Sequence, residues 1–469
     1  MGDQKTIAVI GGGMSGLICA IHLLLKSSGG GPRVFLIEQG TAFGVGAAYS
    51  THNVDHLLNT RAANMSPFPD RPGHFLEWLR MRPEITAASG ASFVSRRLYG
   101  DYLQSLLRDA ACGPDAAGRF YLVPDEAVRL EREGGGFKLH LRVGKVLPVD
   151  AVVLATGNPP PHRPNIRAEA FFDSARYIDD PWDPAAFDAV EPGDAILMLG
   201  TGLTMIDVVL TLKARGHAGP LTALSRRGLL PRRHVLQSQA AQLATPALPP
   251  HLSGALASVR RAIREAAGKG AGWQDVMDTL RPVTSAYWRD LPLSAKRRFL
   301  RHLRPWWGAH RHRLAPQVAD RLEALIRDRS LAVRRGRLIE INLDERSGGP
   351  PVSAAWETPR GKRLHGMKVH HVVNCTGPGG DPTLSRSELL RGLIASGLAR
   401  PDHLRLGLDV DAGGRLIARD GAVADTLFAL GPPTRGMFWE STAVPDIRDY
   451  AEAVAASALQ TLGRDAIPA

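Results

Sequence analysis

A glycine-rich turn near the start of the chain has the spacing of a phosphate-binding loop. It covers residues 11–16 and reads Gly-Gly-Gly-Met-Ser-Gly. An apolar run typical of a buried strand, residues 7–10, precedes the turn, and an apolar stretch typical of a helix, residues 17–25, follows it. Glycines at such a turn let the backbone and the amino end of the helix approach a pyrophosphate. These residues therefore indicate the binding of a dinucleotide.

A second apolar run, residues 34–37, ends at Glu38, which lies 22 positions beyond Gly16. This spacing suits an acidic side chain that accepts hydrogen bonds from the ribose of the bound nucleotide. The sequence thus predicts a strand, turn, helix and strand around one nucleotide. Its predicted nucleotide contacts are Gly11, Gly13, Ser15, Gly16 and Glu38.

The same pattern returns in the middle of the chain. Residues 195–199 form an apolar run, and Gly200-Thr-Gly202-Leu-Thr204 follows, with Met205 in place of the third glycine. The next apolar run, residues 221–224, ends in Ser-Arg-Arg rather than in an acid. Arginines at the ribose position accommodate a 2′-phosphate, which favours NADPH over NADH. The predicted contacts are Gly200, Gly202, Thr204, Arg226 and Arg227; the alternative is that the two arginines are only solvated.

Each unit is followed by a strand-like segment that closes on Thr-Gly. Residues 151–154 lead to Thr156 and Gly157, and residues 371–374 lead to Thr376 and Gly377. A tight turn of this kind lets backbone lie against a cofactor. The repeat predicts an α/β fold with two Rossmann-like, three-layer dinucleotide-binding domains built on parallel sheets. We expect the first domain at 1–165 and 371–469, the second at 166–230 and 331–370, and a helical insertion at 231–330.

Composition narrows the class of protein. Of the 469 residues, 44% are hydrophobic and 22% are charged, which is typical of globular domains. The three cysteines, Cys19, Cys112 and Cys375, are too far apart in the sequence for a disulfide framework, a zinc cluster or a dithiol redox centre. We therefore expect no metal, and a reducing, cytoplasmic setting. The sequence has no apolar run long enough to predict a membrane segment.

The excess positive charge is concentrated in one part of the chain. The formal net charge is +12, and residues 221–313 hold 17 Lys and Arg against 4 Asp and Glu. Apolar periodicity at 252–267 and 273–280 predicts helices there. We expect this insertion to cover a site for an anionic or amine-bearing substrate, with Arg304, His310, Arg311 and Arg313 as its contacts. The alternatives are an arginine-rich surface without a ligand, and RNA binding by arginines and tryptophans.

Several longer stretches carry a family resemblance. They include 44–49 (Gly-Val-Gly-Ala-Ala-Tyr), 304–307 (Arg-Pro-Trp-Trp) and 436–445 (Gly-Met-Phe-Trp-Glu-Ser-Thr-Ala-Val-Pro). With two dinucleotide units, nearly the whole chain resembles the bacterial FAD/NAD(P)-binding flavoproteins related to class B flavin monooxygenases. The resemblance implies FAD on the first unit and NADPH on the second. It adds Gly46, Gly377, Gly431 and Trp439 to the expected cofactor contacts, and Pro432 stands where many such flavoproteins have an acidic residue.

The chemistry expected from this resemblance is oxygenation. Because no cysteine pair can receive electrons, the leading hypothesis is that reduced flavin and molecular oxygen form a C4a-(hydro)peroxyflavin that N-hydroxylates a small amine or amino acid. Asn59, Arg61 and Asn64, in the loop after the second strand, are the expected catalytic residues. An NADPH-dependent reductase or dehydrogenase without a stable peroxide remains an alternative, as does an RNA-binding flavoprotein. We expect no nucleic acid or membrane partner, and the sequence does not specify the oligomeric state.

Overall fold

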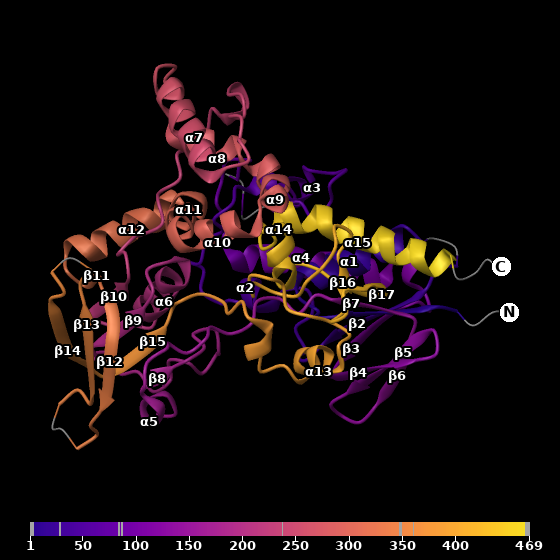
Figure 1. Cartoon of the computed structure of the whole chain (residues 1–469), viewed down its shortest axis with the longest axis horizontal. Helices are drawn as coiled ribbons and strands as arrows, with labels where there is room; N and C mark the ends of the chain where they lie inside the picture. The colour runs from indigo at the N-terminus through magenta and orange to yellow at the C-terminus, as the bar shows by residue number, and fades with distance from the viewer. Residues whose placement is uncertain are drawn as a thin grey trace.

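Two parallel sheets form the two halves of the molecule (Figure 1). The structure, a computed structural model, describes residues 4–27, 30–82, 85, 88–236, 238–346, 349–359 and 361–464. The first sheet has the order β16-β17-β7-β1-β2-β3, in which only β16 is antiparallel to its neighbour. Its strands are β1 (Thr6–Ile10), β2 (Arg33–Glu38), β3 (Phe120–Pro124), β7 (Ala151–Leu154), β16 (Arg415–Ile417) and β17 (Val423–Ala429).

The alternation of side chains along β1 explains how the first half is layered. Ile7 and Val9 point to a core shared with α1 (Met14–Leu25), α4 (Arg96–Cys112) and α15 (Val444–Arg464). Ala8 and Ile10 point to the opposite core, because successive strand residues face opposite sides. That core lies under a three-stranded antiparallel sheet and α13 (Glu388–Ser396). The strands of this sheet are β4 (Ala127–Glu133), β5 (Gly136–Leu141) and β6 (Val146–Val149).

The second half repeats this layering. Its parallel sheet has the order β11-β10-β9-β15-β8. The strands are β8 (Tyr177–Ile178), β9 (Ile196–Leu199), β10 (Leu221–Ser225), β11 (Leu331–Arg335) and β15 (His371–Asn374). One face packs on α6 (Leu203–Ala214) and α12 (Pro316–Arg327). The other face packs on the antiparallel strands β12 (Arg337–Leu343), β13 (Val352–Glu357) and β14 (Leu364–Val369).

The predicted fold class is confirmed, and two predicted boundaries need correction. Residues 371–374 were expected in the returning part of the first domain, but β15 pairs with β9 in the second sheet. The insertion was expected to run to residue 330, but α12 packs Val318 and Leu322 into the core of the second half. In both cases the apolar face of the element decides which half it joins.

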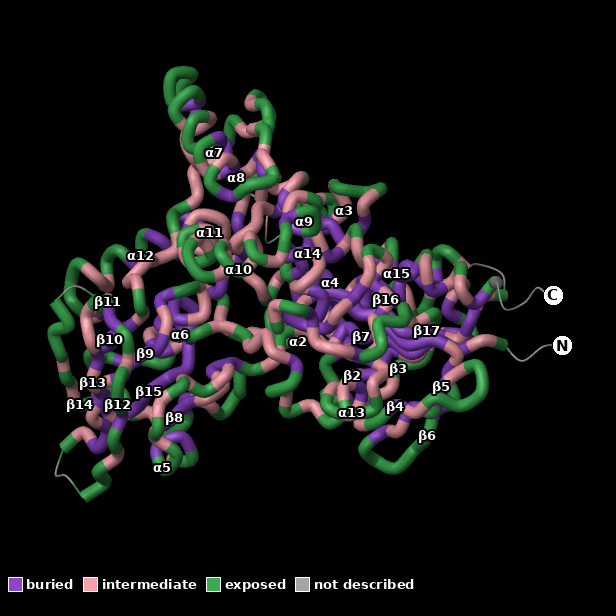
Figure 2. The backbone as a smooth tube through the Cα atoms, in the orientation of Figure 1, coloured by how far each residue is buried: buried purple, intermediate pink, exposed green. Residues whose placement is uncertain are grey.

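The helical insertion divides into an arm and a roof. The arm, α7 (Leu252–Ala267) and α8 (Trp273–Thr279), projects from the body and is mostly exposed along its outer side (Figures 1 and 2). The roof consists of α9 (Arg281–Asp290), α10 (Leu293–His302) and α11 (Arg304–Arg311). It packs on α14 (Arg435–Phe438) and on the residue that follows, since the rings of Trp288 and Trp439 stack at 4.7 Å.

Further short helices and 3-10 turns include α2 (Gly46–Tyr49), α3 (His74–Arg80), α5 (Glu169–Phe172) and the 3-10 turn η6 (Pro432–Thr434). Among the described helices, none has both the length and the apolar character needed to span a bilayer.

A buried ion pair joins the arm to the segment that follows the roof, and we expect its loss to destabilise the protein. Arg313 is 2% exposed and pairs with Asp278 of the arm. Asp278→Ala leaves this guanidinium buried without a partner, which we expect to cost about 3 kcal/mol. The measurement is the urea midpoint followed by tryptophan fluorescence. Asp320→Ala removes the exposed pair with Arg233 and should cost about 0–1 kcal/mol; equal shifts for both variants would contradict the assignment.

Candidate FAD and NAD(P) sites and the cavity between them

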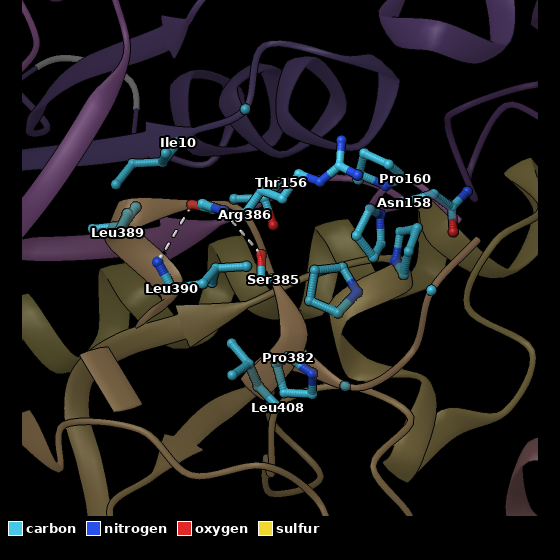
Figure 3. Close-up of a pocket in the computed structure, with 18 of the residues that line it drawn as sticks. Ile10, Thr156, Asn158, Pro160, Pro382, Ser385, Arg386, Leu389, Leu390 and Leu408 are labelled. Carbon is cyan, nitrogen blue, oxygen red and sulfur yellow. Dashed lines mark hydrogen bonds between the residues drawn. The ribbon is translucent and has the colours of Figure 1, made fainter. Parts of the chain in front are cut away.

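The first glycine turn lies at the carboxyl edge of the first sheet, beside a pocket of about 390 Å³. The pocket lies between two parts of the chain that are distant in sequence. Thr156, Asn158 and Pro160, after β7, line one side, and Pro382, Ser385 and Leu389 of the returning segment line another (Figure 3). Gly11, Glu38 and Gly157 also line it. The pocket therefore joins the predicted residues of the first unit to the returning segment.

The geometry of the first turn requires glycine at two positions. Gly11 has a φ of +105°, and a Cβ there would overlap the carbonyl of Ala155. A Cβ on Gly16 would overlap the carbonyl of Gly11, so the helix can approach the strand this closely only without a side chain. Gly13 lies against Gly46, whose Cα would be 3.5 Å from an added Cβ. This close packing of backbone leaves the turn open to a phosphate, which is the requirement of FAD binding.

Glu38 is held in place by the turn itself. Its Oε2 accepts a hydrogen bond of 2.8 Å from the amide of Gly12, and its side chain lines the pocket. Gly431, which follows β17, has a φ of +76° and lies beside Ser15, whose Oγ would be 3.0 Å from an added Cβ. The structure thus brings Ser15, Glu38 and Gly431 to the edge of the sheet where the sequence placed the nucleotide.

A second pocket, of about 710 Å³, lies over the second glycine turn. Gly200 and Gly202 line it with Thr204, Thr376 and Gly377, and Arg226 and Arg227 follow β10 at its rim. One arginine that the sequence analysis missed joins them. Arg335 pairs in register with Ser225 at the ends of β11 and β10, and it lines the adjoining cavity. Its position on a neighbouring strand gives no sequence signal, because the 105 residues between the two strands, 226–330, hold the insertion.

A cavity of about 1020 Å³ separates the two pockets. It shares Asn158 and Arg435 with the first pocket, and Thr204, Arg226, Arg227 and Thr376 are among the residues it shares with the second. The roof helices α10 and α11 and the segment 439–444 line the rest of its wall. Both cofactor pockets therefore open into one central space, which we call the central cavity.

The central cavity is strongly cationic. Eight arginines line it: Arg96, Arg226, Arg227, Arg301, Arg304, Arg311, Arg335 and Arg435. Glu440 is the acidic side chain among its described lining residues. Arg96 is neutralised by Asp207 at 2.9 Å, and Arg311 by Glu440 at 3.4 Å. The other six have no ion pair with a carboxylate in the part of the chain that the structure describes, so the cavity is complementary to anionic ligands.

The wall contains a buried carboxylate, Glu440, and a half-buried imidazole, His312. Burial alone would raise the pKa of Glu440, but the Arg311 guanidinium, with the hydrogen bond from Trp307, holds this pKa below its usual value. The Oε1 of Glu440 also accepts a hydrogen bond of 3.1 Å from the indole nitrogen of Trp307. Burial, helped by Arg311, lowers the pKa of His312 to about 4 despite Glu440. At neutral pH the cavity therefore presents an ionised carboxylate and a neutral imidazole.

Of the three expected catalytic residues, the structure places only Asn59 in the central cavity. Arg61 donates hydrogen bonds to the carbonyls of Val235 and Leu236, which ties the loop to the start of the insertion. Asn64 is exposed and ends a short 3-10 turn. Arg61 and Asn64 lie outside the described lining of the cavity, so a catalytic role for them stays a prediction without a supporting contact.

The expected substrate contacts divide in the same way. Arg304 and Arg311 line the central cavity. His310 lies outside its lining residues and packs against Trp273 with ring centroids 4.9 Å apart. Arg313 is buried and pairs with Asp278, and it also lies outside the described lining of this cavity. The imidazole that does line the cavity is His312, two residues from the one predicted.

The comparison with known proteins agrees with the two-site geometry. Residues 8–159 match the FAD-NAD(P)-binding family model. An uncharacterised protein of Mycobacterium tuberculosis strain H37Rv is 22% identical, covering 97% of this chain and 95% of its own. The solved structure of the ornithine N-hydroxylase of Kutzneria sp. 744 has a TM-score of 0.68 at 12% identity, covering 99% of this chain and 100% of its own. The described chain therefore has the fold of the two-dinucleotide flavoproteins. The match of residues 8–159 to an FAD-NAD(P)-binding model agrees with the cofactors that the resemblance implied.

One further relative has a named activity. The L-aspartate N-monooxygenase (nitrosuccinate-forming) of Streptomyces davaonensis is 28% identical over 48% of this chain and 41% of its own. The match therefore covers part of each protein.

The position of Glu38 predicts a specific loss of FAD affinity. Hydrogen bonds to a charged group are worth about 1.5–3 kcal/mol, so Glu38→Ala should raise the FAD Kd roughly 10- to 150-fold. The measurement is flavin fluorescence during titration of the apoprotein with FAD. The control is Glu131→Ala, which changes an exposed side chain on β4 of the same half and should leave this Kd unchanged. An unchanged Kd in the Glu38 variant would count against the assigned site.

Proposed function

We propose that this flavoprotein is an NADPH-dependent monooxygenase that hydroxylates the amino group of a small anionic substrate, such as an amino acid. The observation that carries the proposal is the central cavity. It opens on both cofactor pockets and keeps Arg301 and Arg304 available on the roof. A substrate there would be next to the reactive ends of both cofactors.

The residues around the two glycine turns fit the two cofactors. The first turn, with Glu38, Thr156 and Gly157, would hold FAD, and the second turn, with Arg226 and Arg227, would hold NADPH. When bound, FAD accepts hydride from NADPH and activates oxygen. In the overall reaction NADPH supplies two electrons, one oxygen atom forms the new N–O bond, and the other leaves as water.

The roof arginines favour a substrate with a carboxylate. A guanidinium binds a carboxylate through two parallel hydrogen bonds, and neither Arg301 nor Arg304 has an ion pair with a protein carboxylate in the described chain. Burial and the nearby Arg226 lower the pKa of Arg304, which still leaves it charged at neutral pH. The partial similarity to an L-aspartate N-monooxygenase supports a substrate of this class.

The alternatives are supported less well. A dithiol reductase needs two adjacent thiols, whereas Cys19 and Cys375 are buried in separate cores and Cys112 is exposed on α4. Burial raises the pKa of Cys19 to about 12, so it remains an unreactive thiol. RNA binding through the insertion needs several free aromatic faces, but Trp288 is buried and Trp273 packs against His310, which leaves Trp306 as the exposed ring among the described tryptophans of the insertion.

The arginines after β10 predict cofactor preference. Replacing Arg226 and Arg227 together by alanine should weaken NADPH use by about 1–3 kcal/mol and leave NADH use nearly unchanged, because only NADPH carries the 2′-phosphate. The measurement is kcat/KM for flavin reduction with each nucleotide. Arg232→Ala is the control, since this arginine is exposed and lies outside the pockets. Equal losses with both nucleotides would show that these arginines do not bind the phosphate.

Oxygenation is tested directly on the holoenzyme. The NADPH-reduced protein is mixed with oxygenated buffer and single amino acids, and the products are separated by mass spectrometry. We expect an N-hydroxylated product with an acidic amino acid, in amounts that match the NADPH consumed. Arg304→Met should raise the KM for this substrate at least roughly tenfold while flavin reduction is kept, because a bidentate carboxylate contact is lost.

A different outcome would support the reductase alternative. If every amino acid gives only hydrogen peroxide and oxidised flavin, with one peroxide per NADPH, the monooxygenase proposal is wrong. The enzyme would then transfer electrons without inserting oxygen into these substrates.

A further inference from the structure

Arg435 occupies the junction between the FAD pocket and the central cavity. It begins α14, directly after the turn η6, at the same edge of the first sheet as the glycine turn. Among the described lining residues, Arg435 and Asn158 are the two that line both spaces. A cofactor that extends from the glycine turn into the central cavity would pass these two side chains.

The guanidinium of Arg435 lacks a counter-ion in the described protein. It lies 4.7 Å from the centroid of the Trp439 ring, and its Nε is buried without a hydrogen-bond partner. Glu440 attracts it, but that carboxylate already pairs with Arg311 and accepts from Trp307. A second cation, Arg304, adds repulsion. Burial first, and then Arg304, lower the pKa of Arg435 to about 10, which leaves it charged at neutral pH.

A half-buried cation whose Nε is buried and unpartnered calls for an anion supplied by a ligand. Removing a charge from water costs several kcal/mol unless it is paired or hydrogen-bonded. FAD carries negative charge at its pyrophosphate and, when reduced, at the pyrimidine edge of the flavin ring. The pyrophosphate already has the glycine turn and the amino end of α1 as its binding site.

The surroundings of Arg435 favour the ring. The cavity wall also includes Trp439, against which Arg435 packs, and Val444, which begins the 21-residue helix α15. The amino end of this helix carries partial positive charge, as α1 does. Two sources of positive charge therefore line the same cavity as the end of the FAD pocket.

We propose that Arg435 places its guanidinium against the pyrimidine edge of the flavin and stabilises negative charge on the N1–C2=O region. The inference depends on FAD binding and not on the oxygenation proposed above. It assigns a role to a residue that lies outside the glycine turns and outside the expected substrate contacts.

Sulfite is a probe of this charge in the oxidised holoenzyme. Its sulfur lone pair forms a bond to flavin N5, and an electron pair of the ring moves to N1–C2=O, so a cation at this edge strengthens sulfite binding. We expect Arg435→Gln to raise the sulfite Kd at least about tenfold. If the two-electron reduced flavin loses the same stabilisation, the midpoint potential of the flavin should fall by about 30 mV for each tenfold change in the equilibrium constant.

Two further variants keep the test decisive. Arg435→Met preserves the apolar stem on Trp439 and should give the same weakening of sulfite binding if the glutamine variant does not retain FAD. Arg419→Gln is the control, because this exposed arginine donates to the carbonyls of Ile394 and Ala395 away from the pockets. It should leave both the sulfite Kd and the midpoint potential unchanged.

Two outcomes would overturn the proposal. A loss of FAD and ADP affinity with unchanged sulfite binding and potential in the retained flavin would assign Arg435 to the pyrophosphate. A higher substrate KM with unchanged sulfite binding, potential and FAD affinity would assign it to the substrate. Because the sulfite titration uses neither NADPH nor oxygen, it succeeds or fails independently of monooxygenase activity.

Discussion

The fold gathers positively charged side chains around the central cavity at partly buried positions, and this is the main electrostatic constraint on the structure. Eight arginines line a space with a single carboxylate, Glu440, among its described lining residues. Two unit charges a few ångströms apart in partly buried protein interact by several kcal/mol, so this arrangement is costly in the absence of anions. Phosphates and carboxylates of ligands remove that cost. The arginines that line the cavity are therefore best explained by ligand binding at the centre of the molecule.

The two halves that enclose this space are joined by a polar contact of low exposure. Asp207 of α6, in the second half, pairs with Arg96 of α4, in the first half, at 2.9 Å. The Nε2 of His56 lies 3.0 Å from the carbonyl of the same aspartate, and burial lowers the pKa of this histidine. Hydrogen bonds of this kind are directional, so they fix how α6 faces the first half. The second glycine turn immediately precedes α6, and its position relative to the first is thereby set.

The sequence analysis predicted the parts of the site that obey local rules. The glycines at positions 11, 16 and 200 could be predicted because the fold restricts these positions to glycine. Backbone approaches their Cα atoms so closely that no side chain fits. Arg435, Arg335 and His312 were missed because nothing in their local sequence marks them; distant segments place them in the wall. The sequence alone could have argued against His310 as a cavity residue. The residues of α11 that line the cavity recur at the spacing of one helix face, and His310 falls outside that spacing; they are Arg304, Trp307, Gly308 and Arg311.

The contacts of the roof attach it to the first half, although in the sequence the roof interrupts the second half. Trp288 donates to the carbonyl of Gly436 at 2.9 Å, and Arg281 of α9 pairs with Asp446 of α15 at 2.8 Å. Arg311 and Trp307 of α11 both contact Glu440. These contacts hold Arg301, Arg304 and Arg311 beside the segment that leads into α15. Arg226 and Arg227, by contrast, are attached to β10 of the other half. Any change in the angle between the halves would therefore move Arg226 and Arg227, the arginines proposed to bind NADPH, relative to the proposed FAD pocket, while the roof arginines would move with the first half.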